Sequence, residues 1–232
     1  MELRAVIFDM DGVLTATDEH HYRSWKKVSK EIDLPFSRED NDKLRGLTRR
    51  DSLEVLLAGR PLPEEQKQAI LQKKNAYFLE SVDNMGPRNL LPGVLALLRE
   101  LQQTVIRTGV ASSSKNVRPV LNQLCITGLI ETIADGASVK NPKPAPDVFL
   151  YTAACLQVKP YECLIIEDSE AGVQAGLEAG MCVLGLGAPA RLCGAHAVLP
   201  DLASVKLSDL REIYFGWRGV MNKGLMISRH KK

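Results

Sequence analysis

The sequence predicts an α/β protein with a Rossmann-like parallel sheet, interrupted by an inserted all-helical domain. Two observations support this class. After residue 92, helical segments alternate with short, wholly apolar strands, a pattern typical of parallel sheets covered on both faces. A similar apolar segment stands at residues 5–8, and the residues between show helical spacing and almost no strand signal. The 232 residues suit one core of ~150 residues plus a smaller insert.

The first predicted strand is Ala5-Val6-Ile7-Phe8, and the insert follows it. Pro63, followed by Glu64 and Glu65, is a helix start with acids at its positive end. Apolar side chains recur at helical spacing in three stretches of the insert, namely Trp25, Val28 and Ile32, then Leu53, Leu56 and Leu57, then Ile70, Tyr77 and Phe78.

The second half alternates regularly. Helices are predicted at residues 94–101, 117–124, 147–156 and 169–179, and strands end near 111, 134, 166 and 185. We therefore expect a discontinuous core domain of residues 1–14 and 92–232, with residues 15–91 forming the helical domain.

The composition is that of an ordinary water-soluble protein, with 45% hydrophobic and 25% charged residues. No apolar stretch approaches the ~18 residues of a membrane helix, and the N-terminal segment is too short and too acidic for a signal peptide. We expect a cytoplasmic protein without a membrane partner. Its five cysteines form no CxxC pair, and we expect reduced, buried thiols, with Cys155, Cys163 and Cys182 among apolar neighbours.

Residues 211–232 carry six basic residues and one acidic residue. Such a tail could bind polyanions. It has few aromatic residues and no nucleic-acid motif, which favours a solvated or loosely packed end and no nucleic-acid partner.

Charged or hydroxyl residues follow three predicted strands. Because parallel strands end at one edge of the sheet, ligands bind there. Asp9 and Asp11 follow the first strand, and Glu167 and Asp168 follow the strand at 163–166. Four converging carboxylates repel one another unless a cation lies among them, and oxygen-only ligands suit Mg²⁺. As the alternative, a single acid of this set could be a helix cap or a solvated loop residue.

These groups together indicate phosphoryl transfer. Lys143 and the turn at Ser112, Ser113 and Ser114 could hold phosphoryl oxygens. Asp9 could be the nucleophile that forms an aspartyl phosphate. Asp11, two residues further along an extended chain, could act as general acid and base.

The same residues resemble the four motifs of the haloacid dehalogenase superfamily, in order and spacing. They are Phe8-Asp9-Met10-Asp11-Gly12-Val13-Leu14-Thr15, Ala111-Ser112-Ser113-Ser114, Lys143-Pro144 and Ile166-Glu167-Asp168-Ser169. The resemblance covers about residues 1–210 and implies that the insert is a helical cap domain.

A second group of residues resembles the β-phosphoglucomutases within that superfamily. It comprises His21, Trp25, the segment Arg45-Gly46-Leu47-Thr48-Arg49-Arg50-Asp51-Ser52-Leu53, Lys73-Lys74-Asn75 and Ser112-Ser113-Ser114-Lys115-Asn116. The resemblance implies interconversion of β-D-glucose 1-phosphate and glucose 6-phosphate through an aspartyl phosphate and β-glucose 1,6-bisphosphate, by a monomer.

The resemblance also implies roles. Asp9 is the nucleophile, Asp11 the acid and base, and Thr17 and His21 position Asp11 at the hinge. The Mg²⁺ ligands are Asp9, the backbone carbonyl of Asp11, Glu167 and Asp168. The transferring phosphoryl group is held by Ser112, the Ser113 amide and Lys143. The second phosphate and the sugar contact Arg49, Ser114, Lys115 and Asn116, with Trp25, Gly46, Leu47, Thr48, Ser52 and Lys74 nearby.

Other interpretations stay open. His21 could be a surface histidine, Arg49 part of a solvated face, Lys115 and Asn116 a helix start, and Trp25 part of the core of the helical domain. A hydrolase of the same superfamily and a non-catalytic sugar-phosphate binding protein are the alternative functions. The chain also departs from the family pattern, with Ala16 where an acid is usual and Ser113 where alanine is common.

Overall fold

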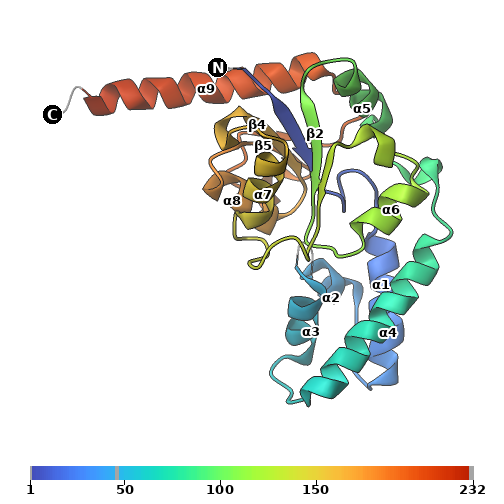
Figure 1. Cartoon of the computed structure of the whole chain (residues 1–232). Coiled ribbons are helices and arrows are strands. Elements are labelled where there is room, and N and C mark those ends of the chain that lie inside the picture. The colour runs from blue at the N-terminus through green and yellow to red at the C-terminus, as the bar shows by residue number, and fades with distance from the viewer. Residues whose placement is uncertain (1, 45–46, 230–232) are drawn as a thin grey trace.

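The computed structural model describes residues 2–44 and 47–229, with side chains described as far as residue 219. These residues form a six-stranded sheet of order β3-β2-β1-β4-β5-β6, in which every pair of neighbours is parallel (Figure 1). The strands are β1 (Ala5–Phe8), β2 (Arg107–Ala111), β3 (Thr132–Ala134), β4 (Cys163–Glu167), β5 (Cys182–Leu186) and β6 (Ala197–Leu199). The predicted α/β class is confirmed.

Helices cover both faces of the sheet because the side chains of its central strands alternate. Val6 and Phe8 pack with α5 (Val94–Gln102), α6 (Val117–Gln123) and α9 (Leu207–Arg229). Ala5 and Ile7 pack on the other face with α7 (Asp147–Cys155) and α8 (Glu170–Glu178). Short 3₁₀ turns occur at Pro87–Asn89, Thr127–Leu129, Pro160–Glu162 and Pro189–Arg191.

The insert consists of α1 (Asp18–Glu31), α2 (Arg38–Asp42), α3 (Arg49–Leu57) and α4 (Glu64–Val82), which we call the helical unit. It has a small core of its own, made of Trp25, Val28, Leu44, Leu53, Leu57, Ile70 and Leu71. Ser37 and Thr48 cap α2 and α3 by accepting backbone hydrogen bonds. Figure 1 shows the helical unit at one end of the sheet and α9 across the other end.

The prediction for the C-terminal segment is wrong over residues 211–217. Residues from Leu207 onward form α9, and Leu207, Leu210, Tyr214 and Trp217 are buried in the main core. The Tyr214 hydroxyl donates to the backbone carbonyls of Glu2 and Tyr161. Of the two basic side chains of this segment that the structure describes, Arg211 is exposed, whereas Arg218 is half-buried over the rings of Tyr161 and Trp217. The last three residues, which were part of the same prediction, lie outside the described range.

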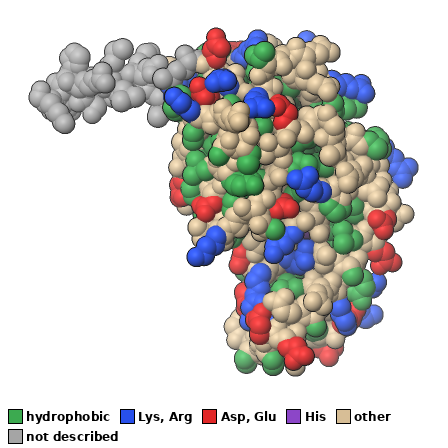
Figure 2. Space-filling model, viewed as in Figure 1, with side chains coloured by type: hydrophobic (Ala, Val, Ile, Leu, Met, Phe, Trp, Pro, Cys, Tyr) green, Lys and Arg blue, Asp and Glu red, His purple; other side chains and the backbone are tan. Residues whose placement is uncertain are grey.

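Three cysteines also differ from expectation. Cys163 and Cys182 are buried as predicted, but Cys125, Cys155 and Cys193 are exposed, Cys155 because it lies at the last turn of α7 on its outer side. All five cysteines are free. Within the described residues, every helix falls short of the length and apolarity of a bilayer span. Figure 2 shows Lys and Arg side chains gathered where the sheet and the helical unit meet.

Candidate active site at the edge of the sheet

A cavity of about 590 Å³ lies between the carboxyl ends of the strands and the helical unit. Thr17 and Glu167 are buried but do not line it, and Gly46 lies outside the described residues. The remaining residues predicted for the site line the wall, namely Asp9, Asp11, His21, Trp25, Leu47, Thr48, Arg49, Ser52, Lys74, Ser112, Ser113, Ser114, Lys115, Asn116, Lys143 and Asp168.

Three carboxylates and one lysine form the buried floor of the cavity. Asp9, Glu167 and Asp168 each offer a carboxylate oxygen, and the three oxygens lie within 4.8 Å of one another. Lys143 Nζ lies 2.7 Å from Asp9 Oδ1 and 2.7 Å from Glu167 Oε1. Burial alone would lower the pKa of Lys143, but these two carboxylates outweigh it and raise that pKa. The lysine is therefore a permanent cation beside the acids.

Two glycines make room for this cluster. Gly12 has a φ of +80°, and a Cβ atom built on it would lie 2.2 Å from Asp168 Oδ2. A Cβ atom on Gly172 would lie 1.8 Å from Glu167 Oε1. Any larger side chain at either position would displace a carboxylate, so the local sequence is fitted to these acids.

The cluster fits a divalent cation. Burial is the main cause that raises the pKa of Asp9 well above its usual value, with Lys143 opposing it and the neighbouring acids adding to it. A cation would relieve this repulsion. The clustered donors within the described residues are all carboxylate oxygens, which hard cations prefer. Asp9, Glu167 and Asp168 would hold such an ion.

Asp11 does not join this cluster through its carboxylate. Its Oδ1 accepts a hydrogen bond from the Thr17 hydroxyl and lies 4.0 Å from His21 Nε2. The four predicted carboxylates therefore do not meet around one point, and the prediction of Asp11 as a ligand concerns its backbone carbonyl only. Burial raises the pKa of Asp11 to about 6, although the Thr17 hydrogen bond opposes the shift. A carboxyl with this pKa can exchange a proton near neutral pH.

His21 and Lys74 form a buried pair above Asp11. Lys74 Nζ lies 2.8 Å from His21 Nδ1 and 4.7 Å from the ring centre of Phe78. Burial, followed by the charge of Arg49, lowers the pKa of Lys74 to about 7. Burial also lowers the pKa of His21 well below its usual value, so His21 is neutral. This pair joins α1 to α4 beside Asp11.

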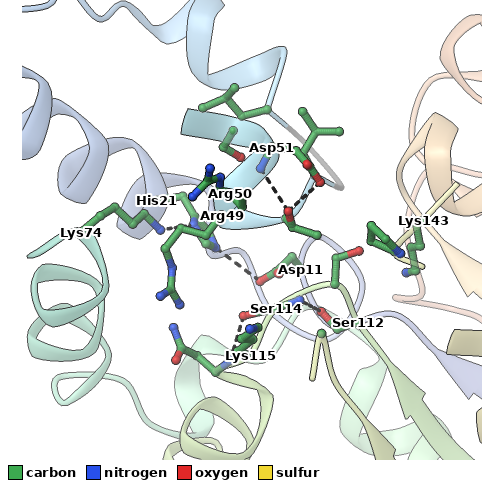
Figure 3. Close-up of a pocket in the computed structure, with 18 of the residues that line it drawn as sticks. Asp11, His21, Arg49, Arg50, Asp51, Lys74, Ser112, Ser114, Lys115 and Lys143 are labelled. Atoms are coloured by element: carbon green, nitrogen blue, oxygen red, sulfur yellow. Dashed lines mark hydrogen bonds and ion pairs between the residues drawn. The ribbon is translucent and has the colours of Figure 1, made fainter. Parts of the chain in front are cut away.

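A second set of donors lies away from the carboxylates, where Figure 3 shows Arg49 extending toward Lys115. Arg49 makes no hydrogen bond or ion pair with any described residue, and burial lowers its pKa. The Ser112 hydroxyl accepts from the Ser114 amide, and the Ser114 hydroxyl accepts from the Asn116 amide, at 3.1 Å each. The turn is thus fixed by its own serines, and Arg49 is available for an anion.

Comparison with known proteins agrees with this arrangement. The profile of the haloacid dehalogenase-like hydrolases matches residues 6–186. The chain belongs to this family. It is 38% identical to the β-phosphoglucomutase of Bacillus subtilis over 220 residues, which cover 93% of this chain and 97% of that protein.

Two further relatives of this haloacid dehalogenase-like chain are informative. The crystal structure of β-phosphoglucomutase from Clostridium difficile superposes with a TM-score of 0.90, at 34% identity, over 94% of this chain and 99% of that one. The phosphorylated carbohydrates phosphatase of Thermotoga maritima is 27% identical over 184 residues, or 77% of this chain and 82% of that protein. The matches thus include an isomerase and a hydrolase.

Two departures from the usual family pattern have visible surroundings. Thr17, which follows Ala16, is the N-cap of α1 but makes no side-chain capping bond, because its hydroxyl is used by Asp11. The Ser113 hydroxyl is buried without a hydrogen-bond partner among the described residues. The backbone at Ser113 still lies on the cavity wall, so the added hydroxyl leaves the turn in place.

Several residues of the cavity were not predicted from the sequence. Asn41, Gln68, Gln72 and Gly136 line the wall. Gln68, Leu71, Gln72 and Lys74 follow at helical spacing, so one face of α4 looks into the cavity. That spacing, extended back from Lys74, is the signal that could have found the two glutamines.

Proposed function

We propose that this protein is a Mg²⁺-dependent β-phosphoglucomutase, which interconverts β-D-glucose 1-phosphate and β-D-glucose 6-phosphate through an aspartyl phosphate and β-glucose 1,6-bisphosphate. The similarity to two β-phosphoglucomutases over nearly the whole chain supports this activity. Five free cysteines support a reducing compartment, and we place the enzyme in the cytoplasm as a monomer.

The observation that carries the proposal is the presence of two separate groups of cationic side chains in one cavity. The floor presents Lys143 and the carboxylate cluster, and the other region presents Arg49 and Lys115. A simple phosphatase needs only the floor. A mutase must also hold the second phosphate of the same sugar, and a planar guanidinium suits a phosphate.

The first chemical step moves a phosphoryl group from Asp9 to the sugar. The hydroxyl oxygen at carbon 6 attacks the phosphorus of the Asp9 phosphate, the bond to the Asp9 oxygen breaks, and Asp11 accepts the hydroxyl proton. The resulting bisphosphate turns round. Asp9 then attacks the phosphorus on carbon 1, and Asp11 returns the proton to the sugar oxygen that leaves. The carboxyl pKa of about 6 at Asp11 suits both directions.

The other floor residues stabilise the transferring group. Lys143 and Ser112 would bind its oxygens, with the Ser113 amide beside them. When bound by Asp9, the Asp11 carbonyl, Glu167 and Asp168, Mg²⁺ supplies positive charge to the phosphoryl oxygens. Arg49, Ser114, Lys115 and Asn116 would hold the other phosphate, and Thr17 and His21 would position Asp11.

We assign residues 1–14 and 92–232 to a core domain and 15–91 to a cap domain. Closure of the cap over the floor would exclude water from the aspartyl phosphate, which favours transfer to a sugar hydroxyl over hydrolysis. Leu47, Thr48, Ser52, Trp25 and Lys74 lie on the cap side of the cavity, which supports their contact with the sugar.

The test follows two products at once. Purified protein is incubated with β-glucose 1-phosphate, Mg²⁺ and a trace of the bisphosphate, and both glucose 6-phosphate and free phosphate are measured. We expect glucose 6-phosphate to form much faster than free phosphate, and Asp9→Asn to abolish both. Free phosphate released as fast as substrate disappears would instead assign a phosphatase, the activity named for the Thermotoga maritima relative.

A further inference from the structure

Asn41 lies on the part of the cavity wall that the helical unit supplies. It belongs to α2, and its side chain and backbone together are 8% exposed. The helical unit also supplies Leu44, Leu47 and Leu71 to this wall, together with charged residues such as Asp18 and Asp51.

The carboxamide of Asn41 makes no hydrogen bond with any described residue, although the residue is more than nine-tenths buried. Nor is it sealed among protein atoms, because neither polar atom of its side chain is both fully enclosed and without a partner among the described residues. A buried amide that lacks partners destabilises the folded state, and most such groups are paired. A polar group kept in this condition on a cavity wall is suited to a ligand.

The side chain of Asn41 is not needed to hold its own helix. Ser37 and Asp40 cap α2 reciprocally, with hydrogen bonds of 3.0 and 3.2 Å. Arg38 ties α2 to α1 through an ion pair of 2.8 Å with Glu19. Asn41 contributes its backbone, whose amide donates to the Ser37 carbonyl at 3.3 Å and whose carbonyl accepts from the Leu44 amide at 3.0 Å. Its amide is thus held in place by groups other than itself.

We propose that the Asn41 carboxamide binds a ring hydroxyl of the sugar phosphate and so contributes to the choice of sugar. The inference rests on the proposed function and deepens it. A hydroxyl both donates and accepts, and a carboxamide offers both a donor and an acceptor. The phosphates would be held by the cationic side chains of the cavity, whereas a neutral amide suits the uncharged ring.

The experiment compares β-glucose 1-phosphate with the three analogues that lack the hydroxyl at carbon 2, 3 or 4. For the wild-type enzyme and Asn41→Ala, kcat/KM is measured on all four substrates. We expect Asn41→Ala to have a kcat/KM on β-glucose 1-phosphate about 3- to 10-fold below that of the wild type, the effect of one neutral hydrogen bond. On one of the three analogues the two proteins should be equally active, because the partner hydroxyl is already missing.

Controls separate contact from a general disturbance. Gln72→Ala removes an exposed amide from the same cavity and should keep the wild-type preference among the four substrates. Hydrolysis of p-nitrophenyl phosphate, which has no sugar, should be equal in the wild type and Asn41→Ala. The thermal midpoint should not fall, since no side-chain hydrogen bond is lost.

An equal loss on all four substrates would overturn the inference and assign Asn41 a structural role. A kcat/KM of Asn41→Ala on β-glucose 1-phosphate equal to that of the wild type would also overturn it. Neither result would affect the proposed mutase activity. If the wild-type enzyme turned over no sugar phosphate while it still hydrolysed p-nitrophenyl phosphate, the proposed function would fail, and this inference with it.

Discussion

Arg49 and Arg50 are adjacent in the sequence but have opposite surroundings. Arg50 makes a two-pronged ion pair with Glu64, at 2.5 and 2.7 Å, and a further one of 3.0 Å with Glu54. Arg49 has no ion pair with a described residue and extends into the cavity (Figure 3). Arg50 is therefore paired within the helical unit, whereas Arg49 is free to bind a phosphate.

We therefore expect Arg49→Ala to lower the kcat/KM of the mutase reaction by about 10- to 100-fold, the effect of losing a charged hydrogen-bonded partner. Release of phosphate from p-nitrophenyl phosphate should change little, because this small substrate has no second phosphate. Arg50→Ala is the matched control and should stay within about threefold of wild type in both assays. Equal losses in the two arginine variants would contradict the assigned roles.

Lys74 gives the protein a pH dependence that its sequence alone does not reveal. Burial lowers its pKa to about 7 in the folded state, against an ordinary value near 10.5. Between these two values the unfolded chain binds more protons than the folded one, so this residue makes the free energy of unfolding rise with pH. In Lys74→Met this contribution is absent.

The free energy of unfolding of both proteins is measured by urea denaturation from about pH 7 to about pH 9. As pH rises, the free energy of unfolding of the wild type should increase relative to that of Lys74→Met. Lys73→Met is the control. Lys73 is exposed and paired with Glu31, which raises its pKa, so its variant should run parallel to the wild type. Parallel curves for Lys74→Met as well would mean that Lys74 is not buried in solution.

Sequence reasoning places residues at strand ends well and places contacts between distant side chains poorly. Asp9, Ser112 and Asp168 line one cavity because parallel strands end at the same edge of a sheet, which follows from their order alone. The hydrogen bond between Asn75 and Asn116 depends on how α4 packs against α6, and no local pattern fixes that packing. The divergence of Asp11 toward Thr17 is likewise a matter of side-chain direction.

At the scale of an element, α9 shows how a charge pattern can hide a packing pattern. Leu207, Leu210, Tyr214 and Trp217 follow at steps of three and four residues, which is the spacing of one helix face. The basic residues at and after position 211 favoured a solvated end in the sequence analysis, yet Tyr214 and Trp217 of the same segment are buried. The apolar residues at helical spacing predict a packed helix, whereas the number of basic residues led to the wrong prediction of a solvated end.

Because α9 is part of the core, Leu210→Ala should lower the free energy of unfolding by about 2 to 5 kcal/mol. Leu210 is fully buried against the sheet, so its removal leaves a cavity. Phe215→Ala on the same helix is the control, because Phe215 is 51% exposed, and it should change stability by less than about 0.5 kcal/mol. Chemical denaturation measures both. An unchanged free energy of unfolding in Leu210→Ala would show that α9 does not pack on the sheet in solution.

At the scale of the whole molecule, we expect the carboxylate cluster to link stability to a divalent cation. An ion that binds only the folded chain stabilises it by mass action, by about 2.7 kcal/mol at 100 times its dissociation constant. We expect Mg²⁺ to raise the thermal midpoint of the wild type and a chelator to abolish phosphoryl transfer. Asp168→Asn should lose most of the thermal rise, because it removes one of the three clustered carboxylates.

Glu170→Gln is the matched control for this measurement. Glu170 lies two residues beyond Asp168 but is exposed at the start of α8 and outside the cluster. It should keep the wild-type rise with Mg²⁺. A similar loss in both variants would point to a general charge effect, and no rise in the wild type would argue against a cation at this site.

The strand order also has a consequence for synthesis on the ribosome. β1 is made first, yet it lies at the centre of the sheet, where Ala5 pairs with Arg107 on one side and with Cys163 on the other. At 5 to 20 residues per second, roughly ten to thirty seconds pass between the synthesis of β1 and the synthesis of β4. During this interval β1 lacks β4 as a neighbour, and molecular chaperones can protect its unpaired edge.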